Sequence, residues 1–192
     1  MKPAPKAAPT ASVIKISLII PIISLSAAGN KGCEKTPGVL NLIVRLGGEL
    51  MPIQQTTPDK AKAILDEDSN AVYLDVRSIP EFTQGHAEGA INIPLMHYNP
   101  AAGGMIPNPD FPKVAEAVLP KDKKLVVGCK MGGRSQKACE ILSRIGYQNL
   151  FNVDGGFGGN DHQKGWKDLG LPVSTENGEG VGYESLAKKA SK

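Results

Sequence analysis

The chain has 192 residues, of which 41% are apolar and 21% charged, a composition typical of a globular protein with one hydrophobic core. Its formal net charge of +3 is concentrated in residues 1–50, which carry six Lys and Arg against two Glu, whereas residues 51–192 carry sixteen basic against seventeen acidic side chains. Because the larger part is nearly neutral, the charge does not suggest a nucleic-acid partner.

Residues 1–50 have two interpretations, and neither gives them a fold. The apolar run at 16–25 is too short to span a bilayer as a helix. With lysines before it and small residues after it, residues 1–28 are similar to a signal peptide, which would make the protein exported or periplasmic. Alternatively, "GGELM" at 47–51 fits a bacterial ribosome-binding site followed by a start codon. We prefer a start at Met51, which predicts a cytoplasmic protein preceded by a disordered translated upstream region.

From Met51 onward, helix and strand signals alternate. Helices are predicted from caps, prolines at first turns and one-face apolar stripes, and strands from short apolar runs. The predicted helices lie within 56–68, 78–86, 112–120, 134–146 and 162–170, and the predicted strands are 71–76, 90–95, 124–129 and 149–153. This alternation predicts an α/β fold in which helices flank both faces of an open parallel sheet.

Two further segments carry no predicted regular structure. The stretch 97–112 has four prolines and two glycines, and we interpret it as a long loop. Residues 174–192 are polar and contain glycine, so they are predicted to form a flexible C-terminal tail. The predicted domain therefore spans 51–173.

The stretch 129–135, "CKMGGRS", lies where a predicted strand turns into a helix, the place at which α/β proteins bind ligands. Glycines allow several backbone N–H groups to point inward, and the helix start and the basic side chains add positive charge. These features favour Cys129 as a thiolate nucleophile rather than a buried packing residue. The binding loop would comprise Lys130, Met131, Gly132, Gly133, Arg134 and Ser135.

The other cysteines are interpreted differently. Cys33 belongs to the segment without a predicted fold, and Cys139 lies beside the apolar stripe of a helix, where packing is the expected role. An odd number of cysteines without C-x-x-C spacing predicts reduced thiols and neither a disulfide framework nor a zinc site.

The loop length separates two chemistries. Tyrosine phosphatases have one residue more between Cys and Arg than the four found here, and usually a His where Gly128 precedes the cysteine. A loop of this size surrounds one sulfur atom closely and is too small for a phosphoryl group. Phosphatase or arsenate reductase activity is therefore the least favoured interpretation.

Three motifs in chain order resemble the rhodanese family of sulfurtransferases over roughly residues 53–173. They are "LDVRSIPEFTQGHAEGAINIPL" at 74–95, "CKMGGRS" at 129–135 and "GYQNLFNVDGGFGGNDHQKGW" at 146–166. The resemblance implies the rhodanese-like fold. It also implies that Cys129 takes a sulfane sulfur from thiosulfate or a similar anion as a persulfide and passes it to cyanide or a thiol, with no metal and no organic cofactor.

Other residues complete the prediction. Asp75 and Arg77 end a predicted strand, and we expect them to brace the active loop, with Glu81 paired to Arg77. An alternative function is a persulfide carrier or interaction module that delivers sulfur to a partner protein. The long segments 97–112 and 156–165 and the tail would then dock the partner. The sequence departs from the family pattern in the length of 97–112, in about five extra residues within 156–165, and in Ala87.

Overall fold

The structure is a computed structural model that describes residues 53–191. The two interpretations of residues 1–50, the preferred start at Met51 and the compartment that depends on them fall outside the described residues. Within 53–191, none of the helices has the length and apolar character needed to cross a membrane.

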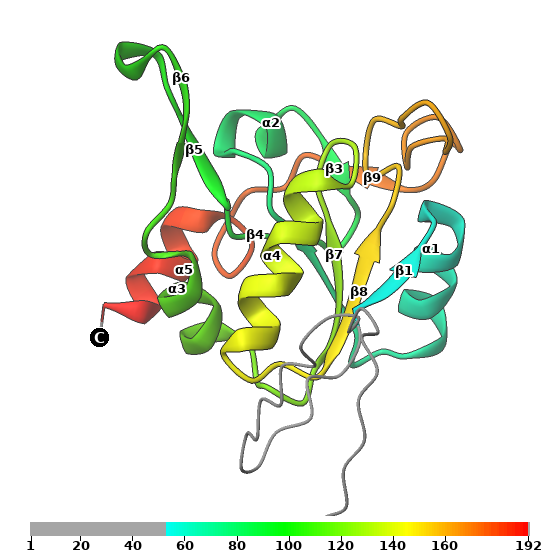
Figure 1. Cartoon of the computed structure of the whole chain (residues 1–192), viewed down its shortest axis with the longest axis horizontal. Coiled ribbons are helices and arrows are strands. Elements are labelled where there is room, and N and C mark those ends of the chain that lie inside the picture. Colours follow the sequence, from blue (N-terminus) through cyan, green and yellow to red (C-terminus); the bar gives the residue numbers. More distant parts are fainter. Residues whose placement is uncertain (1–52, 192) are drawn as a thin grey trace, which may run out of the picture. The chain divides into compact units, whose positions relative to one another are not determined.

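Five parallel strands form the central sheet, in the order β1–β8–β7–β2–β4. Their bounds are β1 (Gln54–Thr56), β2 (Val72–Asp75), β4 (Ile91–Asn92), β7 (Lys124–Gly128) and β8 (Asn149–Val153). β7 lies in the middle, because it pairs with β8 on one side and β2 on the other (Figure 1). The four predicted strands are confirmed, and β1 is an edge strand that the sequence did not indicate.

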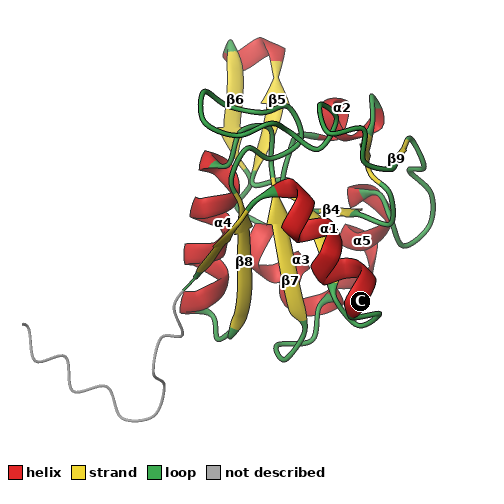
Figure 2. Cartoon of the chain, turned by 90° about the vertical axis from the view of Figure 1, so that its right-hand side faces the viewer, coloured by secondary structure: helices red, strands yellow, loops and turns green. Residues whose placement is uncertain are grey.

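Helices cover both faces of the sheet, as predicted. α3 (Phe111–Val118), α4 (Gly133–Arg144) and α5 (Tyr183–Ala190) share one apolar core with Leu125 and Val127 of β7, whereas α1 (Pro58–Glu67) and α2 (Ile79–Thr83) share a second core with Val126. Figure 2 shows α4 on one side of β7 and β8 and α1 on the other. The alternation of β7 residues between the two cores is the pattern of a strand covered on both faces.

The prediction of an irregular loop at 97–112 is wrong. β5 (Met96–Asn99) and β6 (Gly104–Pro107) form an antiparallel hairpin, joined by the short 3-10 helix η1 (Pro100–Ala102). The side chain of Asn99 closes the turn by accepting hydrogen bonds from the backbone N–H groups of Ala101 and Ala102. Pro100 lies at the turn and Pro107 at the end of β6, where a missing N–H donor breaks no ladder, and Pro112 lies in the first turn of α3. The hairpin projects from the domain beside α2 (Figure 1).

The C-terminal segment also differs from its prediction as a flexible tail. α5 packs against α3, and Leu186 is only 2% exposed within the same core as the sheet. Upstream, β9 (Val173–Ser174) pairs with β3 (His86–Ala87). Residues 174–192 are polar on average, so their composition did not reveal the apolar side chains of α5, which have helical spacing and face the core.

The helix predicted within 162–170 is absent from that described stretch, which forms turns instead. The side chain of Asn160 accepts hydrogen bonds from the backbone N–H groups of His162 and Gln163, and Trp166 donates its backbone N–H to Gly156. The backbone N–H groups of Gln163, Trp166 and Lys167 therefore donate to groups other than the carbonyl one helical turn earlier.

The packing of α5 predicts a measurable stability. Leu186→Ala is expected to lower the free energy of unfolding by about 2–3 kcal/mol, because it leaves a cavity in the main core. Leu169→Ala, at an exposed leucine, is the matched control and is expected to change it by less than about 0.5 kcal/mol. Denaturant titration of both variants measures the difference, and equal stabilities would contradict the packing of α5.

Candidate active site

Cys129 follows directly after the central strand β7, at the carboxyl end of the parallel sheet. β7 and the neighbouring β2 end level with each other, because Gly128 and Asp75 are register partners. The cysteine is 2% exposed, and its side chain contributes to the core that lies under α4. The structure thus places Cys129 at the edge of the sheet where parallel α/β folds bind ligands, as the sequence predicts.

The loop after Cys129 curls around its sulfur atom. The backbone N–H of Gly132 donates to Sγ at 3.1 Å, and Ser135 Oγ lies 3.4 Å from Sγ. The Ser135 hydroxyl is also 2.9 Å from the carbonyl of Gly132, so its single proton serves one of the two acceptors at a time. Gly132 caps α4 with a φ of 111°, a left-handed conformation that disfavours any side chain. The sulfur therefore accepts from the N–H of Gly132 at the positive end of α4.

The glycine-rich segment 155–159, which follows β8, forms a wall beside this loop. The backbone N–H of Phe157 donates to the carbonyl of Cys129 at 2.8 Å, and that of Gly158 donates to the carbonyl of Lys130 at 2.9 Å. Gly156 lies so close that a Cβ atom built on it would be 2.3 Å from the carbonyl oxygen of Cys129. The wall thus fixes the backbone that carries the nucleophile.

Asp75 and Arg77 form a buried ion pair under this wall. Nη2 of Arg77 lies 2.6 Å from Oδ2 of Asp75 and donates at 2.8 Å to the carbonyl of Gly85, and the guanidinium lies 4.2 Å from the centroid of the Phe157 ring. The pair connects β2 to the segment that contacts the carbonyl of Cys129. We interpret this geometry as a supporting role, in which the two side chains brace the active loop.

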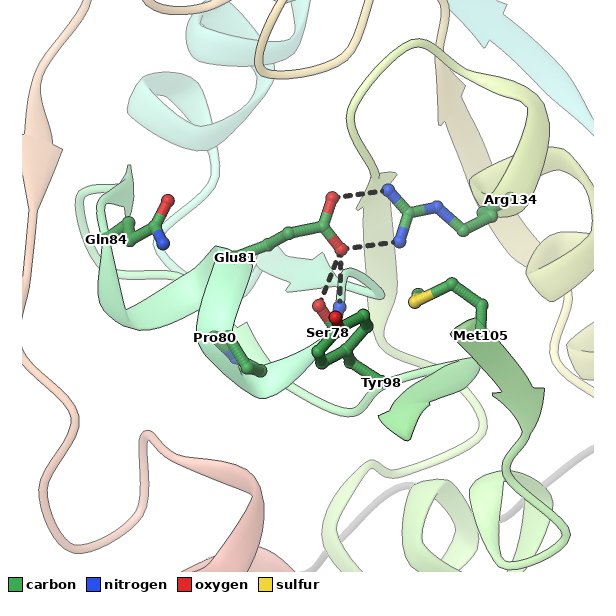
Figure 3. A pocket seen from close by; sticks show the side chains of 7 residues that line it. All are labelled: Ser78, Pro80, Glu81, Gln84, Tyr98, Met105 and Arg134. Atoms are coloured by element: carbon green, nitrogen blue, oxygen red, sulfur yellow. Dashed lines mark hydrogen bonds and ion pairs between the residues drawn. The ribbon is translucent and has the colours of Figure 1, made fainter. Parts of the chain in front are cut away.

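Arg134 and Glu81 form a second ion pair at the mouth of the loop (Figure 3). Two guanidinium nitrogens of Arg134 donate to the two carboxylate oxygens of Glu81, each at 2.7 Å, and Ser78 donates to Oε2 as part of the capping box of α2. The expected pairing of Glu81 with Arg77 is therefore wrong. Arg77 instead faces Asp75, which is two residues away and buried with it.

This second pair shifts both ionisation equilibria. Burial alone would raise the pKa of Glu81, but hydrogen bonds from Arg134 and Ser78 outweigh it and lower the pKa to about 2. The hydrogen bond to Glu81 raises the pKa of Arg134. Both side chains are consequently charged throughout the neutral range, and Arg134 meets Glu81 rather than open solvent.

Three hollows border the loop, and each includes one of its side chains. A basic hollow of about 270 Å³ is lined by Lys130 and Lys167 together with Arg77, Glu81, Gln84, Gly85, Phe157 and Gly158. A second hollow of about 440 Å³ lies between α2 and the β5–β6 hairpin and includes Arg134. Sequence reasoning missed Lys167, Gln84 and the two hairpin side chains Tyr98 and Met105, because no local motif marks them. His162 borders a third hollow with Met131.

The other described cysteine lies in the core. Cys139 is fully buried within α4, and burial raises the pKa of its thiol to about 12. It is therefore protonated at neutral pH and shielded from solvent, which agrees with a packing role.

A model of the family described as the rhodanese-like domain matches residues 57–160, which is more than half of the chain. The chain belongs to the rhodanese-like family. Thiosulfate sulfurtransferase 16, a chloroplastic protein of Arabidopsis thaliana, is 42% identical over 101 residues, or 53% of this chain and 78% of that protein. Thiosulfate sulfurtransferase GlpE of Actinobacillus succinogenes is 30% identical over 128 residues, or 67% of this chain and 96% of that protein.

Solved structures confirm the rhodanese-like fold. A protein of M. tuberculosis matches with a TM-score of 0.55 at 24% identity, over 64% of this chain and 98% of that one. The rhodanese-like domain of an Anabaena protein matches with a TM-score of 0.50 at 21% identity, over 64% of this chain and 79% of that one. At these identities the likeness concerns the fold alone.

The Glu81–Arg134 pair of this rhodanese-like domain predicts a pH dependence. The pKa of Glu81 is about 2 in the folded protein against an ordinary value of 4.5, so the pair stabilises the fold above about pH 4.5, and this contribution is lost as the pH falls toward 2. Over that interval the wild type is expected to lose about 1–2 kcal/mol more unfolding free energy than Glu81→Gln, allowing for partial solvent screening.

Denaturant titration at several pH values measures this difference. Glu116→Gln, which removes an exposed ion pair with Lys121, is the control and should follow the wild type. Parallel pH profiles for the wild type and Glu81→Gln would contradict the assigned strength of the pair.

Proposed function

We propose that the protein is a sulfurtransferase that carries a sulfane sulfur as a persulfide on Cys129. The observation that carries the proposal is the position of the Cys129 sulfur, held at the start of α4 by the N–H of Gly132. The thiosulfate sulfurtransferase names of relatives that are 30% and 42% identical support the same reaction class.

The proposed donor is an anion of the thiosulfate type. It would reach Cys129 past Lys130 and Lys167, whose charges line the basic hollow and attract anions. The Cys129 thiolate attacks the outer sulfur, the S–S bond of thiosulfate breaks, and sulfite leaves with the bonding electron pair. The negative charge of the resulting Cys129 persulfide is stabilised by backbone N–H groups of residues 130–135, in the manner of an oxyanion hole.

The second half-reaction regenerates the thiolate. Cyanide or a thiolate acceptor attacks the outer sulfur of the persulfide, and Cys129 leaves with the electrons of the broken S–S bond. No external oxidant or reductant enters this balance. Asp75 and Arg77 would act as supporting residues that hold the Phe157 wall against the loop.

Intact-protein mass spectrometry of the full chain tests the proposal. Incubation with thiosulfate is expected to add the mass of one sulfur atom at Cys129, and subsequent cyanide is expected to remove it with release of thiocyanate. If Cys129 reacts with an alkylating agent but gains no sulfur from thiosulfate or from a polysulfide donor, the proposal is wrong.

The alternative of a persulfide carrier for a partner protein receives less support. The sequence-based case for it relied partly on display of the C-terminal segment. In the structure, Leu186 is buried and Tyr183 packs against the main core. Tyr183 and Leu186 therefore stabilise the domain itself.

A further inference from the structure

The hollow between α2 and the β5–β6 hairpin, beside the active loop, has the dimensions of a small-molecule site. It measures about 440 Å³, within the range of about 300–1,000 Å³ that is usual for ligand pockets. Its lining comes from α2, from the hairpin and from the active loop: Ser78, Pro80, Glu81, Gln84, Tyr98, Met105 and Arg134 (Figure 3).

The hairpin contributes two apolar side chains to this hollow. Tyr98 and Met105 are register partners across β5 and β6, so both project from the same face of the hairpin. They are 57% and 37% exposed although both are large, and in Figure 3 they lie beside the Glu81–Arg134 pair. His97, one residue before Tyr98, faces the other way and contacts the ring of Tyr183. The core therefore accounts for one face of the hairpin and leaves Tyr98 and Met105 without a packing role.

The charged groups of this hollow neutralise each other. Both carboxylate oxygens of Glu81 accept from Arg134, so an anion that bound Arg134 here would have to displace a bidentate partner. The neighbouring basic hollow differs, because Lys130 and Lys167 line it. Glu81 and Gln84 border both hollows. The basic hollow thus favours an anion, whereas the hollow beside the hairpin favours an uncharged ligand.

We propose that the hollow between α2 and the hairpin binds the sulfur acceptor, and that this acceptor is a small uncharged aromatic thiol. The Tyr98 ring and the Met105 thioether both make favourable contacts with an aromatic ring. This inference rests on the proposed sulfurtransferase function. The acceptor thiolate R–S⁻ attacks the outer sulfur of Cys129–S–SH, the S–S bond breaks, and the products are R–S–SH and the Cys129 thiolate.

Steady-state kinetics with thiosulfate as donor test the proposal. The acceptors are benzyl mercaptan, 2-mercaptoethanol as a small thiol without an aromatic group, and cyanide. In the wild type, kcat/KM is expected to be at least about tenfold higher for benzyl mercaptan than for 2-mercaptoethanol, which corresponds to burial of the ring. In Tyr98→Ala combined with Met105→Ala, the ratio of kcat/KM for benzyl mercaptan to that for cyanide is expected to fall about tenfold, mainly through KM.

Leu169→Ala is the matched control, because it removes an exposed apolar side chain that lines neither hollow. Its ratio should equal that of the wild type. If thiocyanate forms but the two thiols react equally, or the double variant keeps the wild-type ratio, the acceptor site is wrong while the sulfurtransferase function stands. If Cys129 accepts no sulfur from any donor, the proposed function fails and this inference fails with it.

Discussion

Cys129→Ser is expected to lower kcat/KM for thiocyanate formation from thiosulfate and cyanide by at least about a thousandfold, because a serine hydroxyl does not form the persulfide. The fold is expected to survive, since the serine oxygen accepts the hydrogen bond that Gly132 donates to the sulfur. Thiocyanate assays measure the activity, and denaturant titration measures the stability of the same preparation.

The matched control for this variant is Cys139→Ala. Cys139 is buried in the same domain, and burial raises the pKa of its thiol to about 12, so it contributes no nucleophile at neutral pH. Its removal is expected to leave kcat/KM within about twofold of the wild type while lowering stability modestly. If kcat/KM of Cys129→Ser stays above about a thousandth of the wild-type value, or if folded Cys139→Ala loses turnover, Cys129 does not hold its proposed place in the reaction.

The parts of the fold that could be predicted are those in which local apolar patterns and burial agree. The strand at 71–76 reads as continuous apolar sequence because β2 is covered on both faces, and Pro58 after Thr57 marks the start of α1. β1 gives no such signal, because it is an edge strand with Gln54 and Gln55 exposed. α5 was missed for a related reason, since its buried face is short and lies within a polar segment.

For the site, the residues that are contiguous in sequence could be predicted, and those that meet only through folding could not. The residues around Cys129 are contiguous in sequence, so the expected loop is visible as a motif and appears in the structure around the sulfur. The partner of Arg134 is not visible, because Glu81 lies 53 residues earlier and reaches Arg134 only when α2 packs beside the loop. Tyr98 and Met105 likewise meet only through the pairing of β5 with β6, which the prolines concealed.

The glycine-rich wall leads to the second large expected effect. Gly156 has a φ of 51°, and a Cβ atom there would lie 2.3 Å from the carbonyl oxygen of Cys129 and 2.8 Å from the carbonyl carbon of Lys130. Gly156→Ala is therefore expected to lower the free energy of unfolding by about 3–4 kcal/mol, through the left-handed backbone and the displaced loop. It should also lower kcat/KM about a hundredfold, because the sulfur would move from its position relative to the loop N–H groups.

Gly170→Ala separates the backbone effect from the contact with the loop. Gly170 has a φ of 65°, close to that of Gly156, but a Cβ atom there meets nothing within 4 Å. Its substitution is expected to cost about 1–2 kcal/mol of stability and to leave kcat/KM unchanged. Denaturant titration and thiocyanate assays at a temperature where both variants are folded measure the difference. If Gly156→Ala loses no more stability than Gly170→Ala and keeps full activity, the wall does not hold the Cys129 backbone. The loop then keeps its shape without the wall.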